Sequence, residues 1–163
     1  MAPYYGYLLL RSSACLNKVG NLIRSATPQN GSSIHLISRH RVSRAQKYFL
    51  NDMKCPLAFA VVDLAFERKD YDTLERLTAA PPDEDLTIAV ETLSPLYLIQ
   101  SLKRQHPSCT VMALTDRWHS GLSKALTQAV GIDLLEPRES LNTALIENLL
   151  FLTTLNRRTV DVT

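Results

Sequence analysis

The sequence predicts a single α/β domain built on a doubly wound, mostly parallel five-stranded sheet with helices on both faces. Three observations support this fold class. The chain has 163 residues, the size of one ordinary domain. Short apolar runs alternate with segments of helical periodicity, as in repeated strand–helix units. Two of these runs, 57–62 and 110–115, are almost continuously apolar, which is typical of parallel strands covered on both faces.

The first half of the chain contains three predicted strands and two predicted helices. Apolar residues spaced three and four apart predict a helix over 14–26. A second helix, over 42–53, is basic at its start. The three strands are the apolar runs at 7–10, 34–37 and 57–62.

The second half continues the alternation after a less regular middle. A short acidic helix is expected over 70–79, whereas 86–91 is ambiguous between a strand and a helical turn. Ser94 is expected to cap a helix over 95–106, and Ser140 to cap the last helix, over 140–154. Gly131 is expected to end the helix over 117–130. The later elements are helix 95–106, strand 110–115, helix 117–130, strand 132–135 and helix 140–154.

Composition and charge exclude several classes of protein. The 45% apolar and 21% charged residues argue against a disordered chain. The net charge of +2 neither demands nor excludes an anionic partner. No apolar run approaches the roughly 20 residues of a membrane span. The three cysteines are odd in number and widely spaced, which favours a reducing, cytoplasmic setting.

Several segments, taken in order, resemble the receiver domains of two-component response regulators, most closely those of LuxR/FixJ-type transcription regulators. Ala58–Leu64 resembles the third receiver strand, whose aspartate, here Asp63, accepts a phosphoryl group. Val111–Thr115 resembles the fourth strand, which ends in the hydroxyl residue that senses this group, here Thr115. Gly131–Pro137 resembles the fifth strand and its Lys-Pro signature. The resemblance implies a flavodoxin-like sheet order.

This sequence departs from the receiver pattern at the implied phosphorylation pocket. Receivers place an acidic pair that binds Mg²⁺ after the first strand, where this chain has Arg11 and Ser12, or Ser12 and Ser13 in the other register, and neither pair supplies a carboxylate. Mg²⁺ prefers carboxylate and other oxygen ligands, so Arg11 would oppose the ion. The receiver lysine is replaced by Glu136, which precedes Pro137 and would repel phosphoryl oxygens. Phosphoryl transfer depends on charge neutralisation, so these changes predict a degenerate pocket.

The resemblance therefore implies a non-catalytic pseudo-receiver that acts without phosphorylation, in transcription regulation, through protein contact or dimerisation. Asp63 is expected to cap a helix or to accept backbone N–H groups instead. Two alternatives stay open. The chain could be a phosphoacceptor that uses Asp63, with replacement carboxylates from Glu67, Asp70 or Asp72. It could also be a sensor of a small anionic ligand, which Arg11 would bind in the degenerate pocket.

We expect neither a metal nor a cofactor. His106 and Cys109 form a single pair, whereas a zinc site needs four ligands. The basic residues between Arg39 and Lys47 are interpreted as a solvated helix face, and no clustered glycines form a phosphate loop.

The expected partner is another protein or a second copy of the chain, with no direct contact to nucleic acid or membrane. The receiver-like domain is assigned to 1–156, with an insertion at 67–92 and a C-terminal tail at 157–163 that lacks a helix-turn-helix. The candidate interface residues are Trp118, Leu122, Leu145 and Leu149.

Overall fold

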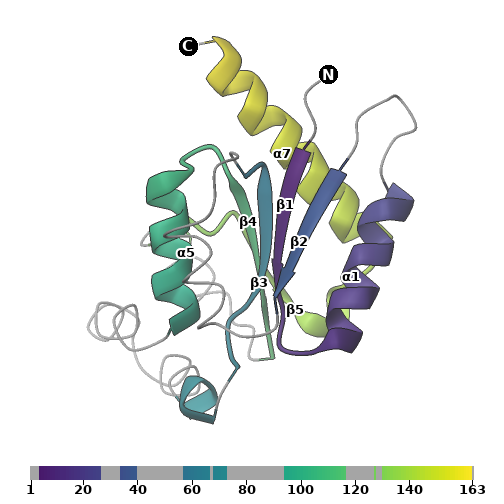
Figure 1. The fold of residues 1–163 in the computed structure, drawn as a ribbon, viewed down its shortest axis with the longest axis vertical. Coiled ribbons are helices and arrows are strands. Elements are labelled where there is room, and N and C mark those ends of the chain that lie inside the picture. The colour runs from purple at the N-terminus through teal and green to yellow at the C-terminus, as the bar shows by residue number, and fades with distance from the viewer. Residues whose placement is uncertain are drawn as a thin grey trace.

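The computed structural model describes residues 4–26, 34–39, 57–66, 68–72, 94–116, 127 and 130–162. These residues form five strands with helices packed on both faces of the sheet (Figure 1). The strands are β1 (Tyr4–Leu9), β2 (Ile34–Arg39), β3 (Phe59–Asp63), β4 (Thr110–Thr115) and β5 (Leu134–Pro137). The helices are α1 (Ser13–Ala26), α5 (Ser94–Gln105), the 3-10 turn η2 (Arg138–Ser140) and α7 (Thr143–Val162).

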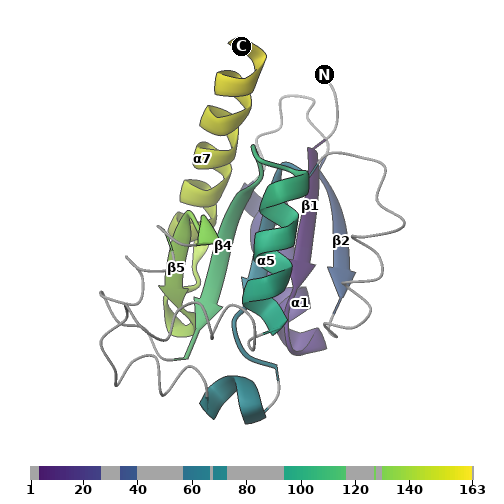
Figure 2. The same cartoon turned by 90° about the vertical axis from the view of Figure 1, so that its left-hand side faces the viewer.

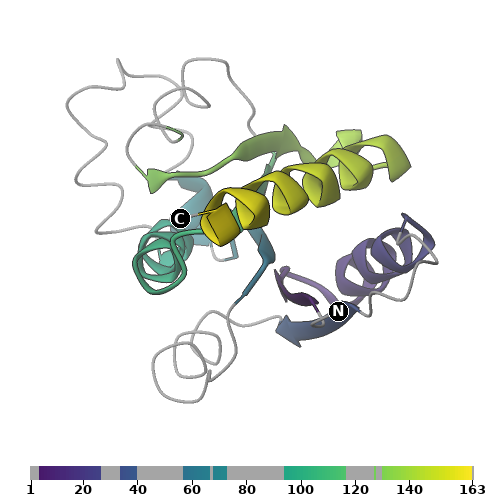
Figure 3. The same ribbon diagram turned by 90° about the horizontal axis from the view of Figure 1, so that it is seen from above.

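The sheet is entirely parallel and has the strand order β2-β1-β3-β4-β5. This is the flavodoxin-like order, so the predicted fold class is confirmed. The topological switch point lies between β1 and β3, where the chain winds outward in two directions. Helices α1 and α7 lie on one face and α5 on the other, as Figure 2 and Figure 3 show from two directions.

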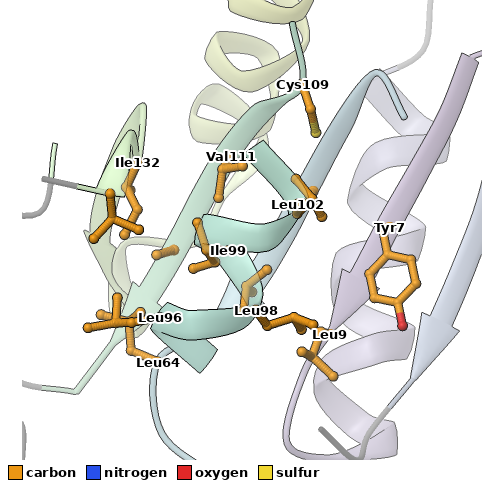
Figure 4. Packing of buried hydrophobic residues seen from close by; sticks show 14 of the residues in the cluster. Tyr7, Leu9, Leu64, Leu96, Leu98, Ile99, Leu102, Cys109, Val111 and Ile132 are labelled. Atoms are coloured by element: carbon orange, nitrogen blue, oxygen red, sulfur yellow. The ribbon is translucent and has the colours of Figure 1, made fainter. Parts of the chain in front are cut away.

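The strands divide their side chains between two apolar layers because successive residues point to opposite faces. Tyr7 and Leu9 of β1 contribute to the layer under α5, whereas Leu8 contributes to the layer under α1 and α7. In Figure 4, Ile99 and Leu102 of α5 lie toward the sheet. Every residue of β3 and of β4 is buried, which explains their continuous apolar sequence.

The beginning of α1 is capped by Ser12. Its hydroxyl oxygen accepts a hydrogen bond from the backbone N–H of Cys15 at 3.2 Å. This contact satisfies one of the four N–H groups that the first turn of a helix leaves without a helical partner. Ser12 was expected in the degenerate pocket, but its side chain stabilises the helix that follows β1.

The cap predicted for the last helix is wrong. Ser140 lies in η2, and Asn142 caps α7 by accepting a hydrogen bond from the N–H of Leu145 at 2.9 Å. The predicted end at Thr154 is also wrong, because the helix continues to Val162. The hydroxyls of Thr153 and Thr154 donate hydrogen bonds to backbone carbonyls one turn earlier in the same helix. The segment expected as a C-terminal tail therefore continues α7.

Strand boundaries shift by a few residues from their predicted positions. The first strand begins at Tyr4 and the last runs from Leu134 to Pro137, whereas β4 has the predicted bounds. Gly131 has the positive φ of 81° expected at a helix stop. The predictions for 42–53, 73–79, 86–91 and 117–126 lie outside the described residues, as does most of the expected insertion at 67–92. Among the described helices, none is long and apolar enough to cross a membrane.

A contact between β1 and β3 provides a direct test of this core. Gly6 pairs with Phe59, and a Cβ atom on Gly6 would overlap with the Phe59 ring. We expect Gly6→Ala to lower the free energy of unfolding by about 1–3 kcal/mol, because a buried ring at a strand pair has little room to move. Urea denaturation measures this change.

Gly20→Ala is the matched control. A Cβ at this helical position meets no atom closer than 3.6 Å, so we expect it to raise the free energy of unfolding by about 0.5–1 kcal/mol. Equal effects of the two substitutions would contradict the packing described for Gly6.

Candidate functional site

The carboxyl ends of β1, β3, β4 and β5 bring four charged residues together. Register pairs Leu9 with Val62 and Thr115 with Pro137, so the residues that follow these pairs also lie close in space. They form what we call the carboxyl-edge cluster, consisting of Arg11, Asp63, Asp116 and Arg138. The cluster lies at the topological switch point, where open parallel sheets bind their ligands.

Asp63 is the buried member of the carboxyl-edge cluster. It ends β3, and its side chain is 0% exposed. Oδ2 accepts a hydrogen bond from the backbone N–H of Arg11 at 2.7 Å. Oδ1 lies 2.5 Å from Nη2 of Arg138 in an ion pair. Both carboxylate oxygens are therefore engaged within the protein, as buried charge requires.

Asp116 joins the two guanidinium groups on the outer side of the carboxyl-edge cluster. Its Oδ2 accepts a hydrogen bond from Nη1 of Arg11 at 2.6 Å, and its Oδ1 accepts one from Nε of Arg138 at 3.1 Å. The side chain is 35% exposed. The charged side chains alternate in sign along a chain of ion pairs, Arg11–Asp116–Arg138–Asp63, and two positive and two negative charges make the cluster neutral overall.

The helical turn at 68–72 closes over the cluster on one side. Nη1 of Arg11 also donates to the hydroxyl of Tyr71, and its guanidinium carbon lies 5.8 Å from the centre of that ring. Asp70 is buried and accepts a hydrogen bond from the N–H of Phe66 at 3.0 Å. Asp70, suggested as a replacement metal ligand, therefore holds the chain after β3, whereas Asp72 is exposed and Glu67 lies outside the described residues.

The electrostatics of the cluster favour the charged forms. Burial alone would raise the pKa of the Asp116 carboxyl, but the hydrogen bonds from Arg138 and Arg11 outweigh burial and lower it. Burial alone would lower the pKa of the Arg138 guanidinium, but Asp63 and Asp116 raise it overall. Asp116 and Arg138 thus stabilise each other's charged form.

Only some of the residues predicted to line the degenerate pocket belong to the carboxyl-edge cluster. Arg11 and Asp63 belong to the carboxyl-edge cluster, and Thr115 is buried at the end of β4 beside Asp116. Pro137 ends β5 in extended conformation and positions Arg138 at the start of η2. Glu136 is half-buried and contributes no ion pair to the cluster among the described contacts.

Sequence reasoning missed Arg138, Asp116 and Tyr71. The cation that pairs with Asp63 is Arg138, immediately after Pro137, whereas the receiver pattern has its lysine before the proline, where this chain has Glu136. Asp116 directly follows a predicted strand, which is the signal that could have identified it, since parallel strands end at one edge. Tyr71 lies in the middle segment, where no periodic pattern predicted its position.

Two of the four candidate interface residues are core residues in the structure. Leu145 and Leu149 are buried against the sheet together with Ile146, because α7 presents this stripe to β3 and β4. Neither leucine side chain is available to a partner on the outer face. Trp118 and Leu122 lie outside the described residues, as does most of the basic segment 39–47.

The described part of the chain holds no cluster of metal-binding side chains. Within the described ranges, no three His, Cys, Asp or Glu side chains gather around one point. Burial raises the pKa of the Cys109 thiol to about 12, so this thiol is not a ready ligand. Mg²⁺, which the receiver resemblance implies, does not fit the carboxyl-edge cluster, because two guanidinium groups already neutralise its carboxylates.

The ion pair between Arg138 and Asp63 makes a quantitative prediction. We expect Arg138→Gln to lower the free energy of unfolding by about 3–5 kcal/mol, because it leaves a buried carboxylate without its counter-charge. The double variant Arg138→Gln/Asp63→Asn recovers most of this loss, since an amide needs no counter-charge. A double-mutant cycle by urea denaturation measures the coupling, and additive effects would contradict the ion pair.

Comparison with known proteins places the fold. No family profile and no curated protein matches the sequence. A CheY-like response regulator receiver domain from Methanospirillum hungatei JF-1 superposes with a TM-score of 0.63 at 9% identity, covering 97% of this chain and 99% of that one. The signal receiver domain of an HD domain-containing protein from Pseudomonas fluorescens Pf-5 gives 0.61 at 12%, covering 97% and 99%.

A response regulator from Thermotoga maritima gives a TM-score of 0.60 at 14% identity, covering 94% of this chain and 99% of that chain. These identities are low, and the likeness concerns the course of the backbone over nearly the whole length of each protein. The chain therefore has the flavodoxin-like α/β fold of response regulator receiver domains.

Proposed function

We propose that this protein is a signalling module of receiver fold that acts without phosphorylation, as a pseudo-receiver. The observation that carries this proposal is the state of Asp63, the residue at the phosphoacceptor position of the resemblance. Its side chain is fully buried, and its two oxygens are held by the N–H of Arg11 and the guanidinium of Arg138. The carboxylate is thus already neutralised by the protein itself.

Phosphorylation of an aspartate has two physical requirements that this arrangement opposes. One carboxylate oxygen must reach the phosphorus of the donor, and the charge that develops must be neutralised at that position. Here Arg138 would have to leave Asp63 before a donor could approach, which would leave a buried charge unpaired. Arg138 thereby occupies the place beside Asp63 that a reacting group would need.

A phosphorylation assay tests this directly. We expect the intact mass of the wild-type protein to stay unchanged after incubation with acetyl phosphate and Mg²⁺, because Asp63 cannot reach the donor. Asp63→Asn is the control for modification at any other residue. A phosphoryl adduct on the wild-type protein that is absent from Asp63→Asn would overturn the proposal and establish the alternative, a phosphoacceptor that uses Asp63.

A module that acts without phosphorylation needs a contact surface, and α7 offers one. Phe151 and Leu155 are 63% and 41% exposed, and their spacing of four residues places them on one stripe of the helix. Figure 2 shows α7 running past the amino-terminal edge of the sheet. At 100° per residue, this stripe lies about 120° around α7 from the buried stripe of Leu145 and Leu149.

Charge along α7 favours a second copy of the chain as the partner. Position 147 is a glutamate four residues before Phe151, and position 158 is an arginine three residues after Leu155. An antiparallel pair of α7 helices, related by a two-fold axis near residue 153, brings position 147 of one copy near the level of position 158 of the other. Such an isologous pairing buries the apolar stripe of one copy against that of the other.

Analytical ultracentrifugation tests the dimer. We expect the wild-type protein to dimerise in a concentration-dependent way and Phe151→Glu to raise the dissociation constant by about tenfold or more. Tyr97→Glu is the matched control, because Tyr97 is an exposed aromatic residue of α5, on the other face of the sheet. A wild-type protein that stays monomeric, or equal effects of the two substitutions, would contradict pairing through α7.

The role in transcription regulation that we propose follows from the resemblance to the receivers of LuxR/FixJ-type transcription regulators. A receiver-type module that dimerises through one helix can regulate transcription in the cytoplasm through a partner that contacts DNA, with no nucleic-acid contact of its own. The neutral carboxyl-edge cluster supports the last point, since phosphate backbones are bound by an excess of positive charge.

A further inference from the structure

The carboxylate of Asp116 occupies the position of a bound anion between two arginines. It accepts hydrogen bonds from Arg11 at 2.6 Å and from Arg138 at 3.1 Å. A second guanidinium nitrogen of Arg11 lies 3.5 Å from Oδ1. Asp116 and Arg11 are both about one-third exposed, at 35% and 30%. This carboxylate, unlike that of Asp63, therefore lies where solvent and small solutes reach it.

Asp116 is not needed to neutralise Asp63. The buried carboxylate is held by Nη2 of Arg138 and by the backbone N–H of Arg11. Asp116 instead contacts Nε of Arg138 and the side chain of Arg11. If Asp116 were withdrawn, Asp63 would keep both of its partners, whereas two guanidinium groups would lose their shared anion.

The two guanidinium groups that remain, Arg11 at 30% and Arg138 at 18% exposed, are suited to an oxyanion. Guanidinium groups present several N–H donors in a plane that matches the oxygens of carboxylates and phosphates. Without Asp116 the remaining three charges sum to +1, so the site would attract an anion from solution. It also lies at the switch point of a parallel sheet, which is where open sheets of this kind bind their ligands.

We propose that Asp116 is the resident anion of a two-arginine oxyanion site, and that an oxyanion of the phosphate class takes its place when the Asp116 side chain withdraws. The proposal rests on the proposed function, because it requires Arg138 to pair with Asp63 rather than leave Asp63 free to accept a phosphoryl group. The site then exchanges an internal anion for an external one, and no covalent bond is made.

Removal of the Asp116 carboxylate tests the proposal. The melting temperature of Asp116→Ala is measured in inorganic phosphate and in chloride of equal ionic strength. We expect phosphate to raise it by about 3–6 °C when present at ten times its dissociation constant. Asp72→Ala is the control, since it removes one exposed negative charge of the same turn that carries Tyr71 without removing a ligand of the arginines. The change in melting temperature from chloride to phosphate should be the same for Asp72→Ala as for the wild-type protein.

A double variant identifies the ligands. Arg11→Gln/Asp116→Ala keeps the backbone N–H that binds Asp63 but loses one guanidinium, so the phosphate effect should disappear. Sodium acetate at the same ionic strength distinguishes a phosphate-class site from a general carboxylate site. An acetate effect as large as that of phosphate would overturn the assignment to the phosphate class, and no phosphate effect on Asp116→Ala would overturn the site itself.

The remaining outcomes are also decisive. If Asp116→Ala is unfolded in chloride, refolding on addition of phosphate supports the site. Failure of both Asp116→Ala and Asp116→Asn to fold in either salt means that Asp116 is a structural ion-pair partner and overturns the proposal. Because inorganic phosphate does not phosphorylate an aspartate, these results are separate from those of the acetyl phosphate assay. A phosphoryl adduct in that assay would reject the proposed function on its own.

Discussion

A carboxylate buried at the end of a central strand must be neutralised, and the arrangement of the carboxyl-edge cluster follows from that requirement. Asp63 is completely buried, and Arg138 lies 2.5 Å from it. An unpaired charge at this depth would cost several kcal/mol. Arg138 can reach Asp63 because Pro137 ends β5 and η2 turns the chain over the edge of the sheet. The position of β5 and the start of α7 thus determine whether the buried carboxylate of Asp63, at the end of β3, is neutralised.

The same pairing connects elements that are far apart in the sequence. Arg11 follows β1, Asp116 follows β4, and Tyr71 lies in a turn beyond β3. Hydrogen-bonded networks of this kind are cooperative, because each charged group orients its neighbours. A change at one exposed member, such as Asp116, can therefore reach four strand ends at once. Under the proposed function, this coupling is how the module responds to its surroundings.

The stripes of α7 differ in exposure. One stripe, with Leu145, Ile146 and Leu149, is buried in the core. The other carries Phe151 and leaves apolar surface exposed. The amino-terminal half of the helix is held by the Asn142 cap and by packing on the sheet. Its later part is anchored at Asn156, which donates a hydrogen bond to Thr110 at 2.6 Å, so the exposed stripe is presented on a fixed helix.

The sequence alone determined the fold class and the order of most described elements, because apolar periodicity reports which faces are buried. The continuous runs around Val61 and Met112 indicated strands covered on both sides, and both strands are fully buried. The lack of carboxylates at Arg11 and Ser12 was also visible from sequence. These properties depend on local composition, which needs no knowledge of distant contacts.

The tertiary structure decided which groups meet at the carboxyl edge. That Arg138 neutralises Asp63 depends on the register of β4 and β5 and on the 3-10 turn after Pro137, neither of which has a periodic signature. The choice of Asn142 over Ser140 as the cap depends on the same turn. Leu145 and Leu149 face the core because of how α7 docks on the sheet. Partners of charged and capping side chains are set by contacts between distant segments, so only the folded chain specifies them.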